Sequence, residues 1–182
     1  MIATELINPQ SRMREVLEAF PGAQRALFRK YHIGGCSSCA FSPEETLEQL
    51  CARNGNIKVE EMLDFIRTSH EGDAKILISP QELAELRKKN PELALLDVRT
   101  REEYEAVKIE GAIHMNQQSM QEILGKWPRE REFVVYDHVG KSGLDAAAYF
   151  LGHGFSGVKC LRGGIDAWAL EVENEMPRYV LG

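Results

Sequence analysis

Short apolar runs alternate with helical stretches over the second part of the 182-residue sequence, and this alternation limits the fold more than any other feature. The runs rich in β-branched, aromatic and leucine side chains predict strands at 76–78, 94–98, 133–136 and 158–161. Strands that alternate with helices predict an α/β domain with a parallel sheet and right-handed crossovers. Because the runs are nearly continuous in apolar residues, we expect helices on both faces of that sheet.

The helix starts can be read in both parts of the chain. Capping boxes that begin at Ser79 and at Thr100 predict helices directly after two of the strands. Before residue 70 only helical periodicity occurs, and Ser42 followed by Pro43 predicts a helix start there, with serine at the N-cap. We therefore expect a small all-α domain over 1–70, a linker over 71–74 and an α/β domain over 75–182.

Composition and charge exclude several classes of protein. The chain is 43% apolar and 27% charged, which is normal for a packed soluble protein and excludes a disordered one. The net charge is −6 and both parts are mildly acidic, so we expect no nucleic-acid partner. The longest purely apolar run, 146–151, is far shorter than the roughly 18–20 residues of a membrane span, and no secretory signal is evident. We expect a cytoplasmic protein that is not bound to a membrane.

A glycine-rich polar loop follows the strand at 133–136, and ligands of open parallel sheets collect at the carboxyl ends of strands. A helix is expected from Leu144 onward. Backbone N–H groups in such a loop can converge at a helix N-terminus, where they favour an anion. The sequence therefore predicts a site for a small anion. Its residues are Asp137, His138, Val139, Gly140, Lys141, Ser142 and Gly143.

Two sets of motifs resemble those of the rhodanese family. Residues 97–99, 103–104 and 109–114 resemble the family pattern D-V-R…E-Y…H-I-P-G-A, and residues 154–168 are similar to its closing G-F…V…L-x-G-G-x-x-A-W. The resemblance covers about residues 75–178 in the right order and spacing. It implies the rhodanese fold, a parallel sheet with helices on both sides.

The loop departs from the family pattern at the position of the nucleophile. Active rhodaneses follow the strand with a loop like C-R-x-G-x-R-S, whose thiolate accepts sulfane sulfur as a persulfide. Aligned on Gly140, this chain has Asp137 in place of the cysteine and His138 in place of the first arginine. A carboxylate cannot form the S–S bond. The resemblance therefore implies a rhodanese-like domain without its sulfurtransferase nucleophile.

Three interpretations of Asp137 stay open. The loop amides could bond its carboxylate directly, so that it replaces the bound anion from within the chain. Alternatively, the loop could be a repurposed pocket in which His138, Lys141 and Ser142 bind a ligand or partner group. Covalent chemistry on the carboxylate is the third interpretation. Cys160, in the last strand, is expected to be a small buried apolar side chain.

Cys36 and Cys39 form a C-x-x-C turn, the second chemical candidate. Residues 31–48 resemble a small helical domain found with hybrid-cluster proteins, over about 5–68, and this implies a redox thiol pair. A structural or metal-binding turn and an inert pair remain alternatives. Zinc would need two more ligands, for which His32 and Cys51 are nearest, although Cys51 falls on an apolar helix face. An iron–sulfur cluster would need four thiolates, which a homodimer would supply.

These observations predict a two-domain protein that serves as a binding or regulatory module in sulfur or redox metabolism. In this hypothesis Cys36 and Cys39 are the reactive thiols, no cofactor or resident metal takes part, and the partner is a small anion, a sulfur donor or a redox protein. The alternative is an active sulfurtransferase or thiol-disulfide reductase. There, Cys36 or Cys39 would carry the chemistry while the loop at Asp137 positions the donor.

Overall fold

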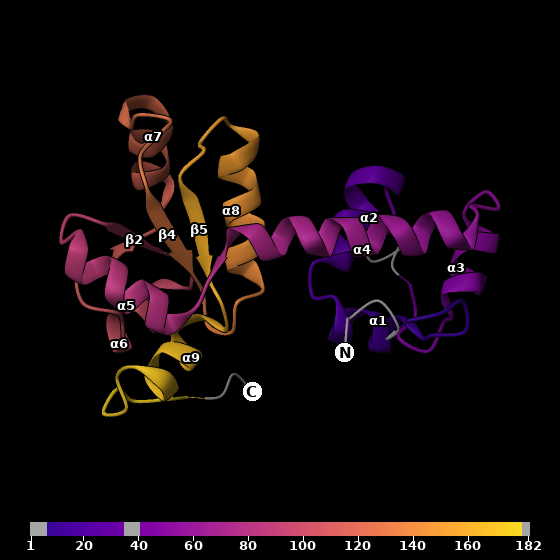
Figure 1. Cartoon of the computed structure of the whole chain (residues 1–182), viewed down its shortest axis with the longest axis horizontal. Helices are drawn as coiled ribbons and strands as arrows, with labels where there is room; N and C mark the ends of the chain where they lie inside the picture. The colour runs from indigo at the N-terminus through magenta and orange to yellow at the C-terminus, as the bar shows by residue number, and fades with distance from the viewer. Residues whose placement is uncertain (1–6, 35–40, 180–182) are drawn as a thin grey trace. The chain divides into compact units, whose positions relative to one another are not determined.

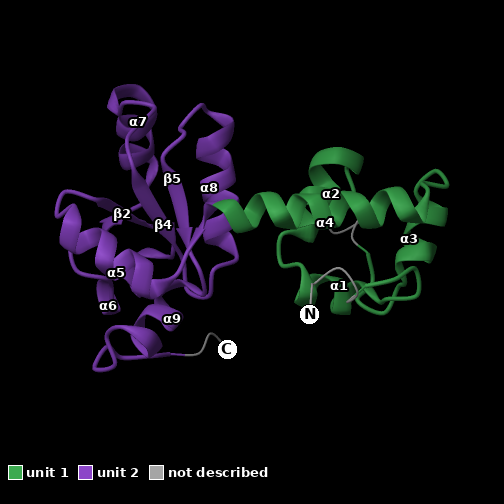
Figure 2. Cartoon of the chain, in the orientation of Figure 1, with its two compact units in different colours: residues 1–75 green, residues 76–182 purple. Residues whose placement is uncertain are grey.

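The computed structural model describes residues 7–34 and 41–179. Contacts divide the chain into a first unit, residues 1–75, and a second unit, residues 76–182 (Figure 2). Within the described ranges, no helix has both the length and the apolar character that a membrane span requires.

The described part of the first unit is helical (Figure 1). Its helices are α1 (Met13–Ala19), α2 (Ala23–Tyr31), α3 (Leu47–Arg53) and α4 (Val59–Ile76), of which the last residue belongs to the second unit. Apolar side chains from all four helices form one buried cluster, which confirms the helical periodicity. The cluster includes Met13, Val16, Phe20, Leu27, Leu47, Leu50, Cys51, Met62 and Ile66.

Helix α3 begins later than the sequence predicts. Its N-cap is Thr46, whose hydroxyl accepts from the Gln49 N–H at 3.2 Å while the Gln49 side chain accepts from the Thr46 N–H at 3.0 Å. The Pro43 carbonyl accepts a hydrogen bond from the Arg14 N–H, 3.0 Å away at the start of α1. The helix start predicted at Ser42 is therefore wrong, because backbone groups of that turn bond to another helix.

The segment expected to link the domains, residues 71–74, lies within α4. The Asp73 carboxylate pairs with the Arg25 guanidinium of α2 at 2.5 Å, and both side chains are largely buried. One turn earlier, the His70 ring packs edge-on against Phe20, with ring centroids 4.9 Å apart. The segment therefore has a helical conformation and contacts the helices of the first unit.

The second unit is built on a five-stranded parallel sheet with the strand order β1-β5-β4-β2-β3. The predicted α/β class with a parallel sheet is confirmed. Only the last two residues of the predicted strand 76–78 form β1, because Ile76 ends α4. The predicted strand 94–98 ends one residue earlier than expected, since Val98 lies just beyond β2. The short edge strand β3 was not predicted. The strands are β1 (Leu77–Ile78), β2 (Ala94–Asp97), β3 (Ile113–His114), β4 (Phe133–Tyr136) and β5 (Val158–Leu161).

Helices cover both faces of this sheet, as the apolar strands predicted. Alternate residues of β4 point to opposite faces: Val134 packs with α5 and α9, and Val135 packs with α7 and α8. The Ser79 and Thr100 capping boxes are present at the starts of α5 and α6. The helices are α5 (Pro80–Lys89), α6 (Arg101–Ala106), α7 (Gln117–Lys126), α8 (Ser142–Gly152) and α9 (Gly164–Glu171).

Candidate functional site

The predicted loop lies where the parallel strands end. Asp97 and Tyr136 are paired at the ends of β2 and β4, and β5 runs parallel to β4 on its other side (Figure 1). The loops that follow these three strands, which include residues 98–100 and 137–141, therefore leave the sheet at one edge. In open α/β sheets this carboxyl edge is where ligands bind.

The loop after β4 closes around its own first side chain. Asp137 is 6% exposed, and its carboxylate accepts hydrogen bonds from the backbone N–H groups of Gly140 at 2.5 Å, Lys141 at 3.0 Å and Ser142 at 2.8 Å. Helix α8 begins at Ser142, two residues before the predicted start. The charge of Asp137 thus lies at a helix N-terminus, and the amides that could cradle an external anion already have an acceptor.

Two glycines allow the loop to pack against the start of α9. Gly164 has φ of +60°, and a Cβ atom there would overlap the backbone carbonyls of Asp137 and His138. Across this contact the Ile165 N–H donates to the Asp137 carbonyl at 2.9 Å, and the Asp166 N–H donates to the His138 carbonyl at 3.1 Å. On the loop side, a Cβ atom at Gly140 would lie 2.8 Å from the Gly163 nitrogen, so Gly140 and Gly164 together allow an approach that side chains would prevent.

Gly143 separates the carboxylate from a buried thiol. A Cβ atom at Gly143 would lie 3.0 Å from the Cys160 sulfur and 3.3 Å from Asp137 Oδ1. Cys160 has no exposed surface and packs in the cluster formed by α7, α8 and the sheet. Its expected role as a buried apolar side chain is confirmed.

The other side chains of the loop divide into exposed and covered groups. Val139, Lys141 and Ser142 are exposed and present an apolar group, a cation and a hydroxyl to solvent. His138 is half-buried because the ring of Tyr179 stacks on it, with centroids 4.4 Å apart and planes 7° apart. The His138 ring nitrogen Nε2 also lies 3.0 Å from the Tyr179 carbonyl oxygen.

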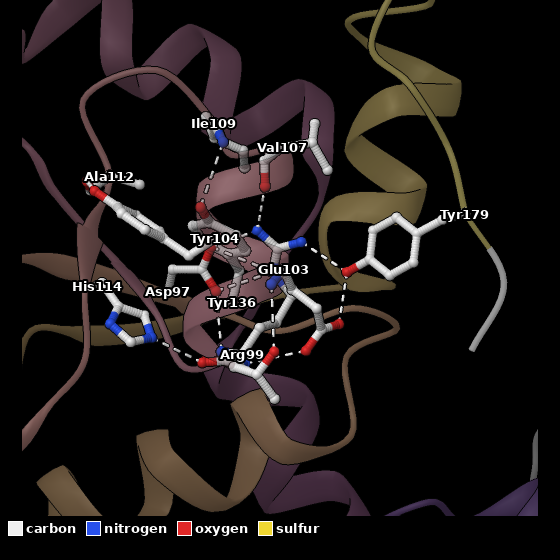
Figure 3. Close-up of polar contacts among 11 residues, drawn as sticks. Asp97, Arg99, Glu103, Tyr104, Val107, Ile109, Ala112, His114, Tyr136 and Tyr179 are labelled. Atoms are coloured by element: carbon white, nitrogen blue, oxygen red, sulfur yellow. Dashed lines mark hydrogen bonds and ion pairs between the residues drawn. The ribbon is translucent and has the colours of Figure 1, made fainter. Parts of the chain in front are cut away.

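A buried polar network stands beside the loop (Figure 3). Arg99 pairs with the fully buried Asp97 through Nη2 at 2.5 Å and through Nε at 3.0 Å. Its Nη1 donates to the Tyr179 hydroxyl at 2.7 Å, and that hydroxyl donates to Glu103 Oε1 at 2.7 Å. Tyr179 therefore joins the loop after β4 to the segment after β2.

Burial and hydrogen bonds in this network shift the pKa values of Arg99, Tyr136 and Tyr179. Burial disfavours the charged form of Arg99, but its hydrogen bonds to Asp97 and Tyr179 outweigh burial and raise the pKa of the guanidinium. Burial raises the pKa of the Tyr136 phenol, which lies beside the Asp97 carboxylate, and it also raises that of Tyr179. At neutral pH Arg99 is therefore a cation and both tyrosines are neutral.

In the sequence, Asp97 and Arg99 stand out only as residues of the family motif, and Tyr179 was not predicted as a site residue. The side chains of Arg99 and Tyr179 meet across 80 positions of the chain. No local pattern around Tyr179 signals this contact.

The thiol pair Cys36 and Cys39 lies outside the described residues. Cys51, one of the two residues expected to be nearest as further zinc ligands, is buried in the core, as its apolar helix face predicted. Its sulfur lies 3.4 Å from the Met62 sulfur. Burial raises the pKa of the Cys51 thiol, which disfavours the thiolate that a metal needs. Among the described residues, no group of three or more His, Cys, Asp or Glu side chains could hold a metal ion.

Replacing Gly164 with alanine should destabilise the second unit by at least about 2 kcal/mol, because the new Cβ would overlap the loop backbone at a positive φ. Denaturant unfolding followed by tryptophan fluorescence measures this effect, since both tryptophans, Trp127 and Trp168, lie in the second unit. Gly152→Ala is the matched control: nothing lies within 4 Å of its Cβ position, and we expect no loss of stability. Equal effects of the two changes would contradict this account of the loop.

Comparisons with known proteins agree on the fold of the second unit. The chain is 36% identical over 104 residues to the probable adenylyltransferase/sulfurtransferase MoeZ of Mycobacterium tuberculosis, covering 56% of this chain but only 26% of MoeZ. It is 30% identical over 98 residues to the thiosulfate sulfurtransferase GlpE of Pseudomonas savastanoi pv. phaseolicola, covering 54% of this chain and 91% of GlpE.

A solved structure has the same fold. Reduced CoADR-RHD of Bacillus anthracis superposes with a TM-score of 0.50 at 18% identity, over 68% of this chain and 22% of that one. The pattern of the rhodanese-like domain matches residues 79–171, just over half of the sequence. The chain therefore belongs to the rhodanese-like family.

Proposed function

We propose that the second unit is a rhodanese-like domain that has lost its sulfurtransferase nucleophile and serves as a binding or regulatory module in sulfur or redox metabolism. The observation that carries this proposal is the Asp137 carboxylate, bonded by three backbone amides of the loop. In the alignment with the family loop, that position belongs to the cysteine that accepts sulfur. Oxygen cannot take the place of sulfur in a persulfide, whatever its charge.

The same hydrogen bonds favour one of the three interpretations of Asp137. Since the amides that point into the loop have an acceptor from the chain itself, the carboxylate acts as an internal substitute for a bound anion. The exposed Lys141 and Ser142 remain available to a partner. A protein partner, which contacts the outside of the loop, then suits this site better than a small anion enclosed by it.

The reactive group in this proposal is the pair Cys36 and Cys39. The pair would act as a redox switch and not as a catalyst: one thiolate attacks the disulfide of a redox protein, and the second thiol releases the reduced partner as the Cys36–Cys39 disulfide forms. The partner gains the two electrons that the pair loses. A cytoplasmic location, where thiols are kept reduced, and a homodimer remain predictions.

The full chain should form thiocyanate from thiosulfate and cyanide no faster than the uncatalysed reaction. GlpE is the positive control. Asp137→Cys should recover little activity, because His138 and Ser142 also differ from the basic residues of the family loop. After treatment of this variant with thiosulfate, peptide mapping should find no added sulfur atom at position 137. Thiocyanate formation by the unchanged chain at an enzymatic rate would contradict the proposal.

The second candidate function is an active sulfurtransferase or thiol-disulfide reductase that uses Cys36 or Cys39. MoeZ and GlpE, to which the chain is similar, both have sulfurtransferase in their names, and this candidate keeps that activity but assigns it to the thiol pair. If the thiol pair carries the chemistry, Cys36→Ser should abolish reduction of a disulfide substrate or sulfur transfer to a thiol acceptor. Cys160→Ser is the control and should leave that activity in place, because Cys160 is buried. Equal activity of the unchanged chain and a variant with both Cys36→Ser and Cys39→Ser would exclude sulfur transfer and disulfide reduction by the pair.

A further inference from the structure

The segment after α9 covers the edge of the sheet at which the candidate site lies. Tyr179 stacks on His138 of the loop and accepts a hydrogen bond from Arg99, while it donates one to Glu103. The hydroxyl of Tyr179 thus has two partners near the end of β2, and its carbonyl and ring both contact His138 of the loop after β4. These contacts place one aromatic residue in a site that matches its shape and its hydroxyl group.

The residue before it adds a charged contact. The Arg178 guanidinium donates to both oxygens of Asp166, at 2.8 Å and 3.1 Å. The hollow bounded by His138, Asp166 and the segment leaves no space for a water-sized molecule. The Asp166 carboxylate therefore recognises the arginine of the segment, and the His138 ring stacks on the tyrosine that follows it. Arg99 and Glu103, which have opposite charges, bond the hydroxyl of that tyrosine.

Beyond its anchor in the core, the segment is held mainly by polar contacts and by a ring stack. Met176 is buried in the cluster of the second unit and anchors the chain. Beyond it, Pro177 and Arg178 are exposed and Tyr179 is half-buried. Release of residues 177–179 would break the hydrogen bonds of Tyr179, one partly exposed ion pair and one ring stack. It would uncover Ile165 and Ala169 at the hollow beneath the segment, and leave Met176 anchored in the core.

We propose that residues 177–179 form a displaceable strap over a peptide-binding site at the loop after β4. The chemistry of the site selects an extended peptide in which a basic residue precedes a tyrosine. The strap fills the site within the chain, and a partner with the same pair of residues competes with it. This inference rests on the proposed function, since it concerns how the loop after β4 is regulated. Its test is separate from that of the proposed function, because peptide binding involves no thiol.

The test measures binding of a fluorescent synthetic peptide with the sequence of residues 175–182 to the full chain. Arg178→Ala/Tyr179→Ala empties the site and should bind the peptide saturably, at least about tenfold more tightly than the unchanged chain, where the tethered strap competes. A peptide with alanine in place of the tyrosine should lose this binding. Tyr149→Ala, which removes an exposed tyrosine of α8, is the matched control and should behave like the unchanged chain.

Binding to the double variant no tighter than to the unchanged chain would overturn the proposal, and so would equal binding of the peptide without tyrosine. Circular dichroism checks that the double variant is folded. If it is not, Tyr179→Phe decides alone, because it keeps the ring and removes only the hydroxyl that joins Arg99 to Glu103. This variant should bind the peptide more tightly than the unchanged chain, and no gain would overturn the proposal.

Discussion

Three backbone N–H groups converge on the Asp137 carboxylate, and the function proposed for this rhodanese-like domain depends on this interaction. A loop of this shape at a helix N-terminus favours negative charge, whether the charge comes from a ligand or from the chain. Here the chain supplies it, on a side chain that is almost fully buried. In the proposed function the cradle is therefore kept, and a side chain of the loop itself takes the place of the ligand.

The surroundings of Asp137 show why the loop keeps its shape. Gly164 lets the start of α9 approach the loop backbone, and Gly143 leaves room for both the carboxylate and the Cys160 sulfur. On the other side, Tyr179 ties His138 to Arg99, whose pairing with Asp97 is buried within the unit. In the proposed function this edge of the sheet lacks the nucleophile, and the exposed side chains of the loop, Lys141 and Ser142 among them, are the first that a partner meets.

Much of the second unit could be predicted because its signals are local. The strands β4 and β5 coincide with apolar runs bounded by polar or glycine residues, and the Ser79 capping box marks the start of α5. The helix start at Ser42 was predicted wrongly because hydrogen bonds to a distant helix outweigh a local capping pattern. The two-residue strand β3 has no apolar run to reveal it and is defined by pairing with β2. The position of Asp137 followed from the loop pattern, but the contact of Tyr179 depends on tertiary structure alone.

The central claim is that the Asp137 carboxylate occupies the site that would otherwise hold an anion. The most direct measurement is a thiosulfate titration, followed by the amide NMR shifts of Gly140, Lys141 and Ser142, in the unchanged chain and in Asp137→Ala. The account predicts that thiosulfate leaves the three amides of the unchanged chain unshifted and shifts them saturably in the variant, where the acceptor has been removed. Saturable shifts of the same amides in the unchanged chain would contradict it.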